Sequence, residues 1–234
     1  PTPGDVTIDG VLGDEEWDKT GRMYVYPVKK IRDRYAVRVY AMWDRDAFYL
    51  GMKYRDPTPM INNVDGVNAP YDGWQSDGFQ GRFVTDYGQI HFTAWYSSIK
   101  DYTVATLSYN RPLNRDNSLV FSRAGKRIND PSGFQMAFKR DTDNRGYVQE
   151  VRIPWKQLYK SVPAIQGGHE FQFTGEYFWG GPTGIKWPAV MWADPMNPAQ
   201  PVRVNVYKNP HTWGEAKLLA EGNLDIEPIE DTGD

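Results

Sequence analysis

The segment AVRVYAMWDRDAFYLGMKYR, residues 36–55, decides the fold class. Apolar side chains occupy alternate positions in each half, and Asp44, Arg45 and Asp46 separate the halves. Because successive side chains of a strand point to opposite faces, this period of two indicates two half-buried strands joined by a tight turn. The sequence therefore predicts a β-hairpin, whose apolar positions are Val37, Val39, Ala41, Trp43, Phe48, Leu50, Met52 and Tyr54.

The same alternation returns along the rest of the chain. It is found at 79–83, 90–94, 134–138, 147–153, 171–179 and 202–206, with turn-forming Gly, Pro, Asn and Asp between these runs. Only Asp14 to Lys19, with Asp14 as N-cap, and Pro154 to Tyr159, with proline in the first turn, have helical character. Many short strands with few helices predict an all-β fold, an antiparallel two-sheet β-sandwich of the immunoglobulin or jelly-roll kind. We expect one domain over 1–220 and a C-terminal tail or linker over 221–234.

Composition excludes several classes of function. The chain has 27 basic and 30 acidic side chains and a net charge of -3, which provides no field to hold nucleic acid. No apolar run reaches the ~18 residues that cross a bilayer, and residues 1–6 lack the pattern of a signal peptide, so we expect a soluble chain. The absence of cysteine excludes disulfides, thiolate metal ligands and thiol nucleophiles, and it is compatible with either side of a membrane.

The aromatic content is the most informative excess. Nine Trp, fifteen Tyr and ten Phe are more rings than an aliphatic core would use. Some of these rings are expected at a surface whose partner has flat apolar faces, as sugar rings do, whereas any single ring can also be core.

The sequence shows no catalytic motif. The three histidines, at 91, 169 and 211, stand in no recognisable triad pattern, and no pair of the thirty acidic residues is distinguished by its spacing. His91 is the only histidine inside an expected strand, on the face opposite Ile90 and Phe92, where it faces either a binding cleft or water. We therefore expect a protein that is not an enzyme.

The loop NNVDGVNAPYDGWQSDGFQ, residues 62–80, combines oxygen ligands with an aromatic residue. Asp65, Asp72 and Asp77 suit calcium, which takes about six to eight oxygen ligands, although the same residues also form turns for conformational reasons. Trp74 lies in this loop rather than in a strand, so it is the best candidate for an exposed stacking platform. A second group of rings, with Trp179, Trp187 and Trp192, follows near the C-terminus, where Trp179 continues a core-type alternation.

Six motifs follow one another along the chain: IDGVLGDEEWDKT (8–20), VYAMWDRDAFYLGMKYRD (39–56), YDGWQSDGFQGRF (71–83), GYVQEVRIPWKQL (146–158), MWADPMNP (191–198) and TWGEAKLL (212–219). In this order they resemble the family 9 carbohydrate-binding modules and their DOMON-like sandwich relatives. The order and the spacing agree with that family across nearly the whole chain.

The resemblance implies a sugar held between two tryptophans, polar side chains on its hydroxyls, and calcium stabilising the loops. The first tryptophan corresponds to Trp74, with Gln80 and His91 near the polar positions. The second falls where this chain has Asn197 and Gln200, so Trp179, Trp187 or Trp213 would have to supply the second wall.

Three hypotheses follow. The leading one is a non-catalytic carbohydrate-binding module, extracellular or periplasmic, that binds a poly- or oligosaccharide and belongs to a polysaccharide-degrading system, with catalytic domains elsewhere in the full-length protein. Its alternative is a haem b-binding DOMON-like electron-transfer domain, since Met52, Met60, Met136, Met191 and His91 are axial-ligand types. The third is a packing domain without a small ligand.

Overall fold

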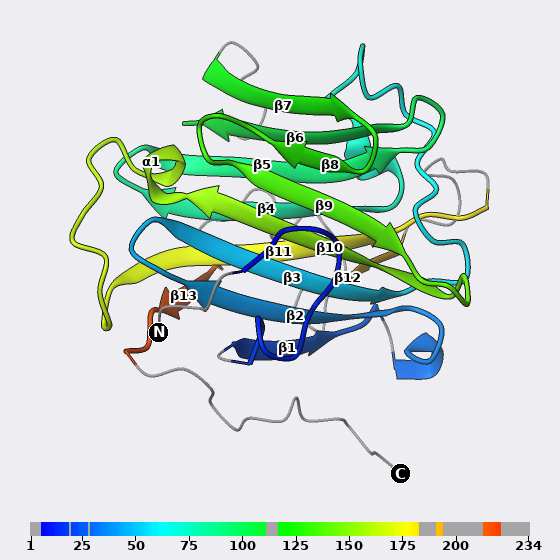
Figure 1. The fold of residues 1–234 in the computed structure, drawn as a ribbon, viewed down its shortest axis with the longest axis horizontal. Helices are drawn as coiled ribbons and strands as arrows, with labels where there is room; N and C mark the ends of the chain where they lie inside the picture. The colour runs from blue at the N-terminus through cyan, green and yellow to red at the C-terminus, as the bar shows by residue number, and fades with distance from the viewer. Residues whose placement is uncertain are drawn as a thin grey trace.

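The structure is a computed structural model, and it describes residues 6–18, 20–27, 29–110, 117–182, 191–193 and 213–220. Two antiparallel sheets lie face to face (Figure 1). This arrangement confirms the predicted all-β sandwich. The strand predicted at 202–206 and the predicted tail at 221–234 lie outside the described residues.

The first sheet, sheet A, has the strand order β1-β2-β3-β10-β9-β8. All of its neighbouring strands pair antiparallel. Its strands are β1 (Gly21–Val25), β2 (Ala36–Trp43), β3 (Ala47–Arg55), β8 (Arg127–Asn129), β9 (Gln135–Arg140) and β10 (Gly146–Pro154).

The second sheet, sheet B, has the order β12-β11-β4-β5-β6-β7, with β13 also paired to β11. Its strands are β4 (Gly78–Thr85), β5 (Gly88–Ser97), β6 (Tyr102–Tyr109), β7 (Ser118–Ala124), β11 (Glu170–Trp179), β12 (Met191–Ala193) and β13 (Gly214–Lys217). The sequence did not single out β6, because its Ala, Thr and Ser residues weaken the contrast between apolar and polar positions.

The predicted hairpin is confirmed as β2 and β3. Val37 pairs with Tyr54 and Trp43 with Phe48, so the turn at 44–46 sets the register. Val37, Val39, Phe48, Leu50, Met52 and Tyr54 are buried in the core between the sheets, and Ala41 and Trp43 pack against that core.

Aromatic rings fill much of this core. Tyr54 stacks on Tyr147 with the ring centroids 4.3 Å apart, and Phe121 stacks on Phe134 at 4.2 Å. Because each aromatic side chain buries about 150–250 Å², these rings supply a large part of the hydrophobic free energy of folding. Many rings of the sequence are therefore structural.

The N-terminal segment crosses the outer face of sheet A (Figure 1). The buried carboxylate of Glu150, on β10, accepts hydrogen bonds from the backbone N–H groups of Asp9 (2.9 Å) and Gly10 (2.5 Å) and from Trp17 Nε1 (3.0 Å). Below Trp17, Gly51 leaves room that a side chain would close, since a Cβ there would lie 3.0 Å from the indole. Glu150 thus fixes this segment to the sheet.

The short helices are few. Pro154 caps α1 (Trp155–Leu158), which confirms the second predicted helix. The first is wrong over the part described, because residues 14–18 form a turn closed by the bond from Trp17 N to Gly13 O (2.9 Å) before β1 begins. Two 3-10 turns, η1 (Lys29–Ile31) and η2 (Gly73–Gln75), complete the elements. In the part of the chain that the structure describes, no helix is long and apolar enough to cross a membrane.

Candidate functional site

Two rows of polar side chains cross the outer face of sheet B. Strand pairing places Glu176 beside Gln80 and Gln80 beside Thr93 in one row. The other row runs from Thr174 through Arg82 to His91 and Ser108. Because side chains alternate along β4, the same strand sends Phe79 and Phe83 into the core.

An ion pair and two hydrogen bonds of the Gln80 side-chain amide connect these rows. Arg82 Nη2 lies 2.8 Å from Glu176 Oε2, and the two side chains are 0% and 2% exposed. Arg82 Nη2 also donates to Gln80 Oε1 (3.3 Å), whose amide nitrogen donates to Thr93 Oγ1 (3.2 Å). A buried charge is tolerated only when it is paired and hydrogen-bonded, so these contacts fix the orientation of the arginine.

Gln80 and His91, both expected to contact a ligand, therefore share one face of sheet B. The structure buries them, with 1% and 5% of their surfaces exposed. The Gln80 amide forms hydrogen bonds with Arg82 and Thr93, so it stabilises the sheet surface in addition to its predicted contact with a ligand. Their contact with a ligand stays a prediction.

Trp74 lies on η2, which contacts β4 and β5 of sheet B. Its side chain is half-buried, whereas the neighbouring Gly73 lies directly on the indole of Trp95. A Cβ at Gly73 would approach Trp95 Cδ1 to 2.1 Å, so only glycine permits this contact. Trp95 itself is fully buried and donates from Nε1 to Pro70 O (3.2 Å).

A buried asparagine fixes the loop on both sides of Trp74. Asn62 Nδ2 donates to Gly73 O (2.8 Å) and to Asp77 O (3.0 Å). Ser76 Oγ adds a bond to Ile61 O (2.7 Å). The indole of Trp74 is thus carried by a preorganised backbone, which lowers the entropy lost when a ligand binds.

Two buried aspartates close the base of the loop. Asp77 accepts hydrogen bonds from Gly180 N (2.5 Å) and Ile61 N (2.9 Å), and Asp56 Oδ1 accepts one from Thr58 N (2.7 Å). Burial raises the pKa of Asp77 well above its usual value, and the adjacent carboxylate of Asp56 raises it further. Burial also raises the pKa of Asp56. The pair therefore favours a state in which the two carboxyl groups share one proton.

The three aspartates predicted to hold calcium do not converge. Asp65 accepts bonds from the N–H groups of Val67 and Asn68, which hold the pKa of its carboxyl below its usual range. Asp72 precedes η2, and Asp77 belongs to the buried pair with Asp56. Within the described ranges, no three His, Cys, Asp or Glu residues are grouped as metal ligands. The three residues as placed do not fit a calcium ion, and calcium binding by the chain stays a prediction.

The structure also corrects the predicted second aromatic wall of the sugar site. Trp179 is fully buried in the core, where it contacts the ring of Tyr54 and donates from Nε1 to Arg55 O (3.0 Å). The prediction that Trp179 contributes a sugar-facing wall is wrong, because its alternation along β11 directs it between the sheets. Trp213 is also buried, and Trp187, Asn197 and Gln200 lie outside the described residues.

Four residues of this region were not predicted from the sequence: Arg82, Glu176, Asn62 and Asp56. Arg82 and Glu176 could have been recognised as charged residues at the polar positions of strands whose other face is aromatic. Asn62 and Asp56 carry no such signal, because their partners are brought to them only by the tertiary fold.

The described residues therefore form a two-sheet β-sandwich with a half-buried tryptophan on a fixed loop beside β4 and β5. The chain belongs to the family described as "Carbohydrate family 9 binding domain-like", whose sequence model matches residues 8–221. This confirms the resemblance that the six motifs indicated. No curated protein matches the chain.

Two solved structures have the same fold. One is a family 9 carbohydrate-binding module from Caldicellulosiruptor kristjanssonii in complex with cellotriose, with 19% identity, a TM-score of 0.55, and 97% of this chain and 96% of that chain covered. The other is a family 9 module from the same organism in complex with glucose, with 18% identity, a TM-score of 0.57, and 96% and 95% covered.

Proposed function

We propose that this family 9 carbohydrate-binding module binds a glucose-based oligosaccharide, without catalysing a reaction, by stacking a sugar ring on Trp74. The observation that carries the proposal is the half-buried indole of Trp74 on a loop that Asn62 fixes beside β4 and β5 of sheet B. The ligands of the two similar structures, cellotriose and glucose, support the choice of sugar. The family match does not favour the haem alternative.

The physical basis is the match between two flat surfaces. One face of a pyranose ring carries C–H groups, which pack on an aromatic face, while the hydroxyls at the rim exchange water for protein hydrogen bonds. Because a single platform buries little area, we expect a Kd on the order of 10 μM to 1 mM. Such a module would serve by holding a chain near catalytic domains outside the cytoplasm, which is the setting that we propose for the full-length protein.

Calorimetric titration with cellotriose and with glucose tests the assignment. Trp74→Ala is expected to abolish measurable binding, because it removes the stacking surface. Tyr26→Ala is the matched control, since Tyr26 is a half-buried ring on the segment that follows β1 of sheet A. Both variants should keep the urea midpoint of the parent. Retention of cellotriose affinity within twofold in a folded Trp74→Ala variant would overturn the proposal.

A further inference from the structure

A cavity lies on sheet A, where β2 begins and β3 ends. It has a volume of about 560 Å³, within the range of about 300–1,000 Å³ that small-molecule sites occupy. Its lining comes from β1, β2 and β3, from residues 33–34 and from the turn between β9 and β10, and it shares no residue with the polar rows or with η2. We call it the Arg55 pocket.

The pocket is basic in a chain that is acidic as a whole. Five cationic side chains line it, against three carboxylates, although the net charge of the chain is -3. The surrounding sequence has the same bias, with nine basic and three acidic side chains between residues 22 and 55. The cationic lining residues are Arg34, Arg38, Lys53, Arg55 and Arg145.

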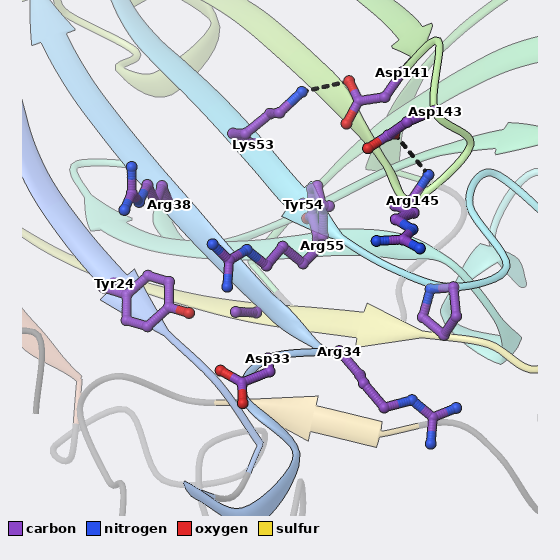
Figure 2. Close-up of a pocket in the computed structure, with 12 residues that line it drawn as sticks. Tyr24, Asp33, Arg34, Arg38, Lys53, Tyr54, Arg55, Asp141, Asp143 and Arg145 are labelled. Carbon is purple, nitrogen blue, oxygen red and sulfur yellow. Dashed lines mark hydrogen bonds and ion pairs between the residues drawn. The ribbon is translucent and has the colours of Figure 1, made fainter. Parts of the chain in front are cut away.

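Neither Asp141 nor Asp143 forms an ion pair with the guanidinium of Arg55 or Arg145. Asp141 forms its ion pair with Lys53, and Asp143 accepts a hydrogen bond from the backbone N–H of Arg145 (3.0 Å) rather than from its guanidinium. Figure 2 shows the Arg55 side chain reaching across the pocket toward Tyr24. In the described part of the chain, no carboxylate forms an ion pair with the guanidinium of Arg55 or Arg145.

Guanidinium groups and an aromatic ring together define the chemistry of a ligand. A guanidinium presents a planar fork of N–H donors that matches the two oxygens of a carboxylate. Tyr24 is half-buried at the pocket, and its ring lies 6.0 Å from the guanidinium carbon of Arg38. Such a ring can receive the face of a sugar beside the charge.

A neighbouring cavity extends the pocket along sheet A. It shares Lys53, Asp141 and Asp143 with the pocket, adds Lys139 and Arg140, and has a volume of about 680 Å³. The two cavities together offer a basic path long enough for more than one sugar residue. A chain with repeated carboxylates suits this path better than a single small anion.

We propose that the Arg55 pocket binds the carboxylate of an acidic oligosaccharide, a glycan that contains uronic acid. The inference rests on the proposed function only in taking the ligand to be a glycan, because it uses different residues from Trp74. The guanidinium groups of Arg55 and Arg145 each bind a carboxylate of the glycan, and Tyr24 packs against the sugar ring beside Arg55.

Calorimetric titration of the whole chain with trigalacturonate tests this, with its methyl ester as the uncharged match and cellotriose as the neutral sugar. The test variant is Arg55→Gln/Arg145→Gln, whose side chains are both exposed. The control is Arg123→Gln/Arg127→Gln, which removes two exposed positive charges from β7 and β8, at the opposite edge of the molecule (Figure 1).

The expected result is a loss of trigalacturonate affinity of about tenfold or more in the test variant, because charge-assisted hydrogen bonds are lost. The control variant and Trp74→Ala should keep that affinity within twofold, and the methyl ester should bind at least tenfold more weakly. Raising the salt concentration should weaken trigalacturonate binding and leave cellotriose binding unchanged.

Several results would refute the proposal that the Arg55 pocket binds an acidic oligosaccharide. They are an equal loss in the control variant, a loss in Trp74→Ala alone, equal binding of the methyl ester, and equally strong binding of single-stranded DNA through the same arginines. Cellotriose binding without trigalacturonate binding would refute the pocket and leave the Trp74 site standing. Trigalacturonate binding through the arginines without cellotriose binding would refute the Trp74 site and leave the pocket standing.

Discussion

The carboxyl group of Glu150 should make the stability of the fold depend on pH in a predictable direction. Burial raises the pKa of Glu150 from its ordinary value of 4.5 to about 7, against the opposing effect of its three N–H donors. The folded protein therefore binds this proton more tightly than the unfolded chain does. The stabilisation from Glu150 is complete below pH 4.5 and is lost as the pH rises through about 7.

The magnitude follows from the size of the shift. Each pKa unit corresponds to about 1.4 kcal/mol, so a rise from 4.5 to about 7 amounts to about 3 kcal/mol in the free energy of unfolding. Glu150 is fully buried, so solvent does not screen the interactions that shift its pKa. The Asp56 and Asp77 pair, whose pKa values are also raised, adds a dependence of the same sign, so the contribution of Glu150 must be isolated by difference.

The perturbation is Glu150→Gln, compared with the parent by urea unfolding at pH 4.5 and at pH 8, with tryptophan fluorescence as the signal. The variant loses hydrogen bonds to Asp9, Gly10 or Trp17, but that cost does not titrate and cancels between the two pH values. The advantage of the parent over the variant should therefore be about 3 kcal/mol larger at pH 4.5 than at pH 8. A difference that stays constant with pH within about 0.5 kcal/mol, a typical error of such comparisons, would refute the reasoning.

Two further predictions concern the buried polar residues and the loop. Glu176→Gln should lower the free energy of unfolding by about 3–5 kcal/mol, because it removes the buried counter-charge of Arg82. The control Glu170→Gln, in the exposed pair with Lys217, should leave the urea midpoint nearly unchanged, and equal midpoints for the two variants would show that the buried pair is not coupled to folding. Because the three predicted calcium ligands do not converge, Asp65→Asn should leave any calcium-induced rise of Tm unchanged. Melting curves of the parent and the variant, recorded with calcium and with chelator, measure that rise. A rise that disappears in the variant would support the predicted calcium site.

The sequence by itself determined the fold class and the family of this protein. Strict alternation at 36–55 defined the β2–β3 hairpin, since only a strand repeats every two residues. Trp74 was predicted to be a stacking platform because a large ring in a loop rich in turn formers has no ordinary core role, and its contact with a sugar stays a prediction. The six motifs were sufficient to indicate the family that the comparison then confirmed.

Only the tertiary structure decided which side chains meet. Trp179 and Trp74 are equal as residue types, but strand pairing directs the first into the core and the loop carries the second to the surface. The sequence does not distinguish Asp77 from the other aspartates, because its partner Asp56 is placed beside it by the end of β3. Arg34, Arg38 and Arg55 of the Arg55 pocket are close in the chain, but Arg145 joins them only because β10 pairs with β3. Local pattern fixes the direction of a side chain within its element, whereas its neighbours, and hence its charge state and its ligand, depend on the packing of segments far apart in the sequence.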